Sequence, residues 1–198
     1  MTVICLTGGI AAGKSTASQF LANEGAFIID ADKLGHEVYE PGTDGFNAVV
    51  DAFGSDIVAD DGQIDRRALG GKVFGQPDEL KRLTDIVWPE IRKLAEARIN
   101  ESKASDPQRV VVLEAAVLFE AGWDDVGDQV WVVVVDPEIA IDRAVARDSL
   151  DREAVKNRLD AQLSNAERTA KADVVIDNSG SEQQMIDHLK SVWREVTG

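Results

Sequence analysis

A glycine-rich segment near the start of the chain could bind phosphate. Residues 8–15 read GGIAAGKS and follow the pattern G-x-x-x-x-G-K-[ST]. In such a loop the backbone N–H groups bind phosphate oxygens, glycine allows a close approach, and the following helix adds its positive end. The lysine, here Lys14, reaches the β- and γ-phosphates, and the hydroxyl of Ser15 is a ligand of Mg²⁺. The segment therefore predicts binding of a nucleoside triphosphate with Mg²⁺.

Acidic residues at two other positions could complete a phosphate-transfer site. Asp30-Ala31-Asp32 and Glu114 both come at the end of an apolar run. Transfer to an alcohol needs an acid that orients the hydroxyl and takes its proton, and Asp32 is a candidate for that base. Equally, Asp32 could cap the helix that follows it. Glu114 could hold the water shell of Mg²⁺, and its alternative is an ordinary solvated strand end.

A pair of arginines could neutralise charge on the transferred group. Arg143 and Arg147 are four residues apart, so they share one face of a helix. Two guanidinium groups over a γ-phosphate would stabilise the charge that develops during transfer. The alternative is that both arginines form surface ion pairs with Asp142 and Asp148.

Five apolar runs predict the strands that must position these residues. None of the runs alternates with polar residues, which is typical of parallel strands covered on both faces. Helical patterns separate them, so the fold class is α/β with a five-stranded parallel sheet flanked by helices. Ligands bind at the carboxyl edge of such sheets, where these runs turn polar. The runs are 3–6, 26–29, 110–113, 130–135 and 174–176.

Two stretches lie outside this alternation of strands and helices. Residues 32–108 are too many for one crossover and carry helical patterns at 65–74 and 78–100, so they predict a helical insertion. Pro89 would kink the second of these helices or start a new helix turn. In the second stretch, 137–172, Pro137 is a plausible helix start and Asp151 a candidate N-cap. Ser181 and Gln184 form a capping-box pattern before the last helix.

Composition limits the classes of protein that the chain can be. Its 198 residues are 44% hydrophobic and 29% charged, which predicts one globular domain with room for a small insertion. The net charge of −15 argues against general nucleic-acid binding but allows a local anion site. A single cysteine, Cys5, excludes an internal disulfide and fits a reducing compartment. We therefore expect a cytoplasmic protein without nucleic-acid or membrane partners, and a monomer, although the sequence does not exclude an oligomer.

The phosphate loop leaves three classes of nucleotide-binding protein to compare. A GTPase would need an N-K-x-D motif, which this sequence lacks, and a motor ATPase usually needs a longer chain. A small-molecule kinase fits the length. A regulatory module without transfer activity is a further alternative, against which the joint presence of Lys14, Ser15, Asp32 and Glu114 argues.

Several separated signatures resemble one family, the dephospho-coenzyme A kinases. They follow one another in the order of that family over nearly the whole chain. The signatures are the opening LTGGIAAGKST at 6–16, Asp30-Ala31-Asp32, Glu40-Pro41-Gly42, Asp65-Arg66-Arg67 with Leu69, Leu118-Phe119-Glu120, and ADVVIDNSG at 172–180.

The resemblance implies a reaction and a division of the chain. The reaction is ATP-dependent phosphorylation of the ribose 3′-hydroxyl of dephospho-coenzyme A, the last step of coenzyme A synthesis. The fold is that of a P-loop kinase with a helical acceptor-binding insertion and a lid. The nucleotide core would be 1–31, 109–136 and 173–198, the acceptor domain 32–108, and the lid 137–172.

The resemblance also implies roles for individual residues. ATP would be bound by Gly8, Gly9, Ala11, Ala12, Gly13, Lys14, Ser15, Thr16, Arg143, Arg147, Asn178 and Gly180. The acceptor would be bound by Asp32, Arg66, Trp88 and Glu120, with Asp32 as the general base and Lys14, Arg143 and Arg147 as the other catalytic residues. Ser15 and Glu114 would hold Mg²⁺, the latter through water.

Three positions depart from the family pattern. The family usually has His-Pro where this chain has Trp88-Pro89, proline at the position of Ala116, and often glutamine at that of Ala140. If the family's histidine touches the acceptor, Trp88 must do so differently, for example by stacking.

Overall fold

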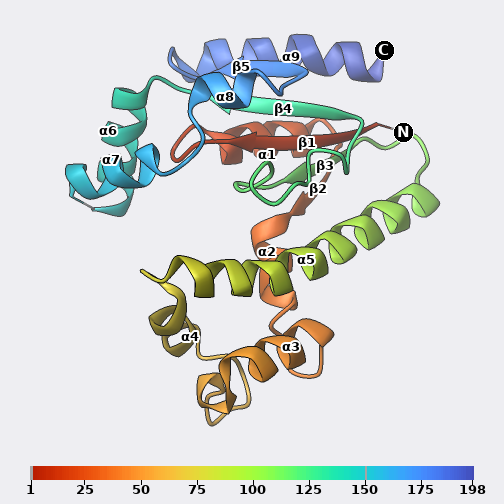
Figure 1. The fold of residues 1–198 in the computed structure, drawn as a ribbon. Coiled ribbons are helices and arrows are strands. Elements are labelled where there is room, and N and C mark those ends of the chain that lie inside the picture. Colours follow the sequence, from red (N-terminus) through yellow and green to blue (C-terminus); the bar gives the residue numbers. More distant parts are fainter. Residues whose placement is uncertain (1, 150) are drawn as a thin grey trace. The chain divides into compact units, whose positions relative to one another are not determined.

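In the computed structural model, which describes residues 2–149 and 151–198, the five apolar runs form one sheet (Figure 1). All the strand pairs are parallel, and the order is β2-β3-β1-β4-β5. This confirms the predicted fold class. The strands are β1 (Val3–Gly8), β2 (Phe27–Asp30), β3 (Val111–Glu114), β4 (Gln129–Val134) and β5 (Val174–Asp177).

The chain divides into two compact units. The first contains the chain up to Asp30 together with Ile99–Gly198, and the second is Ala31–Arg98. The sheet therefore lies wholly in the first unit. Helix α5 (Pro77–Ser105) begins in the second unit and ends in the first.

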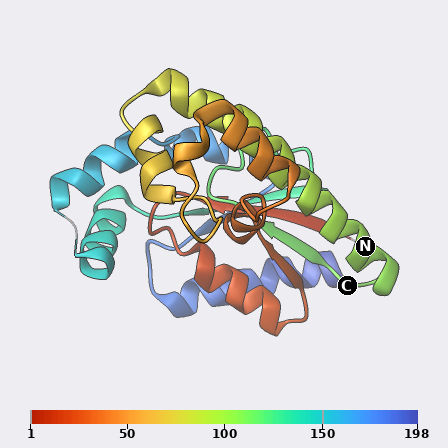
Figure 2. The ribbon, with the colours of Figure 1, turned by 90° about the horizontal axis from the view of Figure 1, so that it is seen from below.

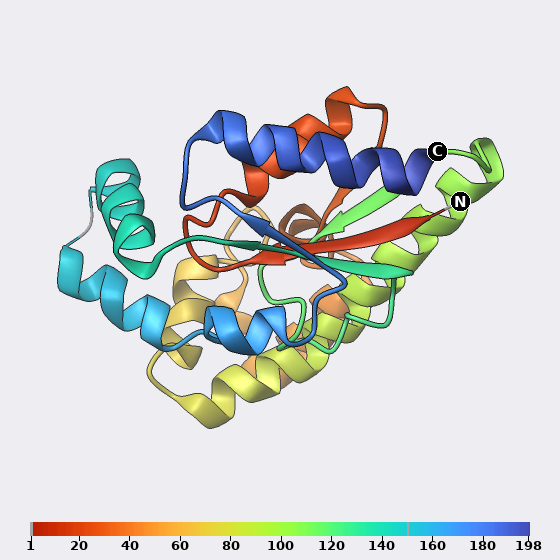
Figure 3. The ribbon, with the colours of Figure 1, turned by 90° about the horizontal axis from the view of Figure 1, so that it is seen from above.

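Two helices cover one face of the sheet. Helices α1 (Lys14–Asn23) and α9 (Glu182–Thr197) lie side by side there, as Figures 2 and 3 both show. The short helix α8 (Asn165–Thr169) lies against β4 on the other face (Figure 3). Because helices cover it, every residue of the central strand β1 is buried. The strands therefore show no alternation of polar and apolar residues.

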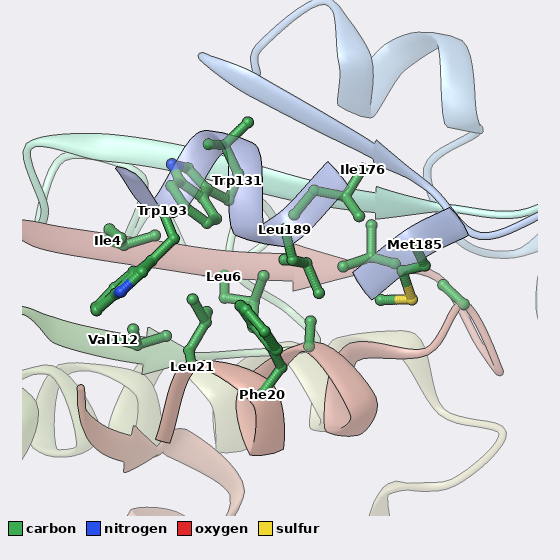
Figure 4. Packing of buried hydrophobic residues seen from close by; sticks show 14 of the residues in the cluster. Ile4, Leu6, Phe20, Leu21, Val112, Trp131, Ile176, Met185, Leu189 and Trp193 are labelled. Carbon is green, nitrogen blue, oxygen red and sulfur yellow. The ribbon is translucent and has the colours of Figure 1, made fainter. Parts of the chain in front are cut away.

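The main hydrophobic core fills the space between the sheet and these two helices (Figure 4). Phe20 and Leu21 of α1 pack there with Leu189 and Trp193 of α9 and with strand residues such as Ile4. Full burial of a side chain of this size stabilises the fold by roughly 1.5–3 kcal/mol. The core thereby fixes the start of α1, and with it the end of the glycine-rich segment.

Helices α6 (Pro137–Asp148) and α7 (Arg152–Asp160) project from the carboxyl end of β4 (Figure 1). The predicted local signals are confirmed: α6 begins at Pro137, and the Asp151 carboxylate accepts hydrogen bonds from the first turn of α7. The capping box of Ser181 and Gln184 at the start of α9 is also confirmed. A small buried cluster, Ile141, Ala144 and Val155, packs between α6 and α7, and Arg152 of α7 pairs with Glu138 and Asp142 of α6.

The second unit is helical, as the long insertion predicted. Val49, Ile57, Leu69 and Val73 are among its buried apolar residues. Helix α5 continues through Pro89 as one element, so no new helix starts there. The other elements are α2 (Ala31–Glu37), α3 (Asp44–Phe53), the 3₁₀ turn η1 (Ser55–Ile57) and α4 (Arg66–Val73).

Candidate functional site

The glycine-rich segment joins the end of β1 to the start of α1, and two of its glycines cannot be replaced without a clash. A Cβ on Gly8 would lie 2.4 Å from the carbonyl oxygen of Val133. Gly13 has φ of +104°, and a Cβ there would lie 2.2 Å from Nδ2 of Asn178. Both positions need glycine because the loop packs directly on β4 and on the segment after β5.

The start of α1 leaves backbone N–H groups facing the loop. Gly13 occupies the N-cap position and has no side chain with which to cap the helix. The N–H groups of the first turn, which includes Lys14, Ser15 and Thr16, are therefore suited to an anion. The Lys14 ammonium lies across the loop, where its Nζ donates to the carbonyl oxygens of Gly8 at 2.9 Å and Gly9 at 3.1 Å. The loop thus carries a positive side chain and a helix N-terminus at one place.

Two acidic residues meet at the carboxyl edge of the sheet. Asp30 of β2 and Glu114 of β3 are partners in the strand register. The Ser18 hydroxyl donates a hydrogen bond to the Glu114 carboxylate, and Ser15 lies one turn before Ser18 on α1. A hydroxyl and a carboxylate beside a phosphate site suit Mg²⁺, which takes one or two protein oxygens together with phosphate and water. Among the described residues no cluster of three or more metal-ligating side chains exists.

Asp32 lies in the first turn of α2, two residues beyond the end of β2. Its side chain is exposed. Asp32 is inside the helix rather than before it, so it is not the N-cap residue. Its negative charge in the first turn still interacts favourably with the helix N-terminus. Its position leaves the carboxylate accessible to a substrate.

Arg143 is connected through hydrogen bonds to two of the other predicted nucleotide-binding residues. Its Nη2 donates to the carbonyl oxygen of Asn178 at 3.1 Å. The buried Asn178 amide in turn donates to the carbonyl oxygen of Ala12 in the loop at 2.8 Å. Residues from α6, from the segment after β5 and from the loop are therefore connected, although they are far apart in the sequence. Gly180 is exposed just before the first turn of α9.

Arg147 has a different environment from Arg143. It is exposed and forms a two-point ion pair with Asp148, with distances of 2.7 and 2.8 Å. The hydrogen bond from Arg147 holds the pKa of Asp148 below its usual value. The surface-pair alternative thus describes Arg147 in this structure, whereas Asp142 pairs with Arg152 and not with Arg143.

The predicted acceptor residues of the second unit lie on two helices. Arg66, at the start of α4, is exposed, with Nη1 3.0 Å from Nε2 of His36 and its guanidinium 5.5 Å from the centre of the Tyr39 ring. Trp88 is half-buried on α5. Neither His36 nor Tyr39 was predicted for the site, since nothing in their spacing connects them with residue 66.

The segment 159–168 also contributes two residues that the sequence did not single out. Gln162 accepts a hydrogen bond at Oε1 from the backbone N–H of Ile10 in the loop, at 3.1 Å. Arg168 is buried, and its Nη2 lies 3.7 Å from Oε1 of Glu120. The sequence around Arg168 gives no sign that this side chain is buried, because its burial depends on tertiary packing alone.

A cavity of about 350 Å³ lies beside the loop within the first unit. Its walls come from the loop, from the start of α6 and from the segment 159–168. Gly9, Ile10 and Ala12 form the loop wall, and Gln162 and Arg168 contribute polar groups.

Comparison with known proteins identifies the family of the chain. The family model described as dephospho-CoA kinase matches residues 2–184. The dephospho-CoA kinase of Geobacter sulfurreducens is 46% identical over 193 residues, which cover 98% of each chain. That of Streptomyces avermitilis is 40% identical over 99% of this chain and 94% of its own.

Solved structures give the same result at the level of the fold. The dephospho-CoA kinase of Campylobacter jejuni has a TM-score of 0.73 at 29% identity, covering 98% of this chain and 96% of its own. A protein of Thermus thermophilus has a TM-score of 0.81 at 34% identity, covering 100% of this chain and 98% of its own. A shikimate kinase of Acinetobacter baumannii, at 14% identity and a TM-score of 0.55, covers 99% of this chain and 93% of its own, and shares the fold.

Proposed function

The chain belongs to the dephospho-CoA kinase family, which carries out the final step of coenzyme A biosynthesis, and from this premise we propose how its residues perform the reaction. The γ-phosphoryl group of ATP passes to the ribose 3′-hydroxyl of dephospho-CoA. A bond forms between the 3′-oxygen and the γ-phosphorus, the bond to ADP breaks, and the hydroxyl proton goes to a carboxylate. The observation that carries the proposal is the Lys14 ammonium lying across a loop that requires Gly8 and Gly13.

The loop binds the phosphates of ATP. The N–H groups from Ala11 to Thr16 supply donors, and the ammonium of Lys14 exchanges the carbonyl oxygens of Gly8 and Gly9 for phosphate oxygens. These groups are already in place before the substrate arrives, so little reorganisation opposes binding.

Asp32 is the general base for the acceptor. Its exposed carboxylate orients the 3′-hydroxyl and takes its proton as the new bond forms. Arg66, Trp88 and Glu120 bind the rest of the acceptor, with His36 and Tyr39 keeping Arg66 in position.

Ser15 and Glu114 would hold Mg²⁺. The Ser15 hydroxyl would be a direct ligand, and Glu114, which accepts a hydrogen bond from Ser18, would bind the water shell of the ion. When bound, the ion neutralises part of the phosphate charge.

Residues 137–172 form the lid, with 32–108 as the acceptor domain and 1–31, 109–136 and 173–198 as the nucleotide core. Arg143 and Arg147 bring positive charge to the phosphates, and Asn178 and Gly180 lie on the adenine side. Closure would exclude water, which otherwise hydrolyses ATP.

The partners are the two small substrates. Among the residues that the structure describes, no helix has the length and apolar character to cross a membrane. We propose a cytoplasmic enzyme that acts as a monomer and binds neither nucleic acid nor membranes.

A coupled ADP-release assay tests the function. Dephospho-CoA, adenosine, gluconate and shikimate are offered at fixed ATP and Mg²⁺. We expect turnover with dephospho-CoA only, and a product whose phosphate is on the ribose 3′-oxygen by ³¹P NMR. Faster turnover with another acceptor would reject the proposal.

A further inference from the structure

Arg168 is a buried cation whose hydrogen-bonding groups are only partly used. Its side chain is 2% exposed. Nη1 donates to the carbonyl oxygen of Leu163, whereas Nε and Nη2 have no hydrogen-bond partner among the described residues. Arginine stays charged in folded proteins, and a buried charge without partners is unfavourable. The free edge of this guanidinium therefore suits an anion.

Glu120 does not satisfy that edge. Its Oε1 is 3.7 Å from Nη2, beyond the range of an N–H···O hydrogen bond, and its side chain is 31% exposed. The ion pair is thus long and partly in solvent. A second acceptor is still needed for Nε and Nη2, which lie on the same side of the planar group and fit two oxygens at once.

The cavity beside the loop brings this guanidinium to backbone that binds phosphate. Arg168 lines the cavity together with Gly9, Ile10 and Ala12. A Cβ placed on Gly9 would be 3.5 Å from Nη1 of Arg168, which is an ordinary van der Waals contact, so the guanidinium lies next to this glycine. Apolar side chains such as Val135 and Leu159 form much of the remaining wall. An apolar wall excludes water and strengthens the attraction between charges.

The Gln162 side chain shows where an oxygen atom sits in this cavity. Its Oε1 accepts from the Ile10 N–H, and the same atom would lie 3.7 Å from a Cβ on Gly9. An amide oxygen therefore occupies a position next to a loop N–H, in the cavity that Arg168 also lines. A phosphate oxygen has the same acceptor chemistry with more negative charge.

We propose that Arg168 binds a phosphate group of a substrate, which enters the cavity beside Gly9 and takes two N–H groups of the guanidinium. The inference rests on the proposed function for its two sources of phosphate: the γ-phosphate of ATP and the diphosphate of dephospho-CoA. Arg168 is thus a phosphate-binding residue in addition to the loop.

Binding measurements on Arg168→Met test this, with Arg158→Met as the matched control. Arg158 is an exposed arginine on α7 that does not line the cavity. Calorimetry with ATP, dephospho-CoA and inorganic phosphate is combined with the melting temperature without ligand. Charge-assisted hydrogen bonds of this kind change the Kd by about 10- to 100-fold. We expect such a loss in Arg168→Met, an unchanged or higher melting temperature, and a Kd within about twofold of wild type in the control.

The arms of the experiment separate the outcomes. A loss confined to ATP assigns the γ-phosphate, and one confined to dephospho-CoA assigns the diphosphate. Unchanged affinities for all three probes overturn the proposal, as does a loss accompanied by a lower melting temperature, which would make Arg168 structural. Should Arg168→Met not fold, Arg168→Lys keeps the charge without the two-point geometry, and wild-type affinity in that variant overturns the proposal.

The binding arms do not depend on turnover. If the wild-type protein failed to phosphorylate dephospho-CoA, the proposed function would fall. The ATP and phosphate titrations would still decide whether Arg168 binds phosphate.

Discussion

At the scale of single residues, Asp32 is where binding and chemistry can be separated. The loop and the start of α1, where we propose that ATP binds, do not include Asp32, so we expect its removal to leave nucleotide affinity nearly unchanged. Asp32→Asn keeps the shape of the side chain but cannot take a proton. We expect kcat to fall by about 10²–10⁴-fold, as for loss of a general base.

Steady-state kinetics and ATP titration of this variant give the two measurements. Asp51→Asn, at an exposed aspartate of α3, is the control and should behave as wild type. If ATP binding rather than the rate were lost, Asp32 would have a metal-binding or structural role instead.

Gly13 allows a sharper test of the loop, because Gly25 has a similar positive φ angle but no atoms near the position of a Cβ. The φ angles are +104° and +100°, but a Cβ on Gly25 would meet nothing within 4 Å. Gly25→Ala should lose about 1–2 kcal/mol of unfolding free energy from the left-handed conformation alone and keep its ATP affinity. Gly13→Ala should lose more, because the new Cβ displaces Asn178, and ATP binding should be abolished. Urea unfolding and ATP titration check both; equal effects of the two substitutions would contradict the role of Asn178.

The place of the loop residues in the fold could be predicted because the motif fixes their spacing within a single turn. The resemblance singled out Asn178, and the spacing singled out Arg143; the structure connects these two residues by a hydrogen bond. The sequence could not predict Arg168 or Gln162, since their place beside Gly9 depends on how the segment 159–168 packs. A basic residue among acids has the same local pattern whether it is buried or exposed.

At the scale of elements, α6 and α7 pack on each other through a small cluster of their own. Their cluster has three buried residues, and Ile10 and Ala11 of the loop pack against it. Elements with so small a core open at low free energy. We expect the amides of 137–172 to exchange hydrogen faster without ATP than with ATP and Mg²⁺.

Hydrogen exchange followed by mass spectrometry measures this difference. Peptides of α9, which packs in the main core, serve as the internal reference and should not change. Equal protection of 137–172 in both states would argue against a lid.

Element boundaries were predictable where a local signal sets them. Pro137, Asp151 and Ser181 act through a fixed dihedral angle or a cap within one turn, and all three helices begin there. The effect of Pro89 could not be predicted from its neighbours in the sequence, because a proline inside a helix can either kink that helix or start a new turn. The packing of residues such as Val87 and Ile91 favours one continuous α5.

At the scale of the whole molecule, Cys5 reports on the stability of the sheet. Burial raises the pKa of its thiol from 9.0 to about 12. The unfolded chain therefore loses this proton at a lower pH than the folded protein does. Stability from this group is fully present below about pH 9 and is lost as the pH rises towards 12.

Urea unfolding at about pH 8 and about pH 10 measures this loss. We expect a lower unfolding free energy at the higher pH, and a smaller decrease in Cys5→Ala, which has no thiol to ionise. A decrease of the same size in both proteins would show that other groups cause it.

The pairing of β1 has a consequence for how the chain matures during synthesis. Val3 pairs with Val111 of β3, and Ile4 pairs with Gln129 of β4. The partners of β1 thus leave the ribosome roughly a hundred residues after it does, and such distant pairings form late. The nascent chain cannot build the glycine-rich turn after β1 until β3 and β4 have emerged, so a nucleotide that binds this turn can assist only the last stage of folding.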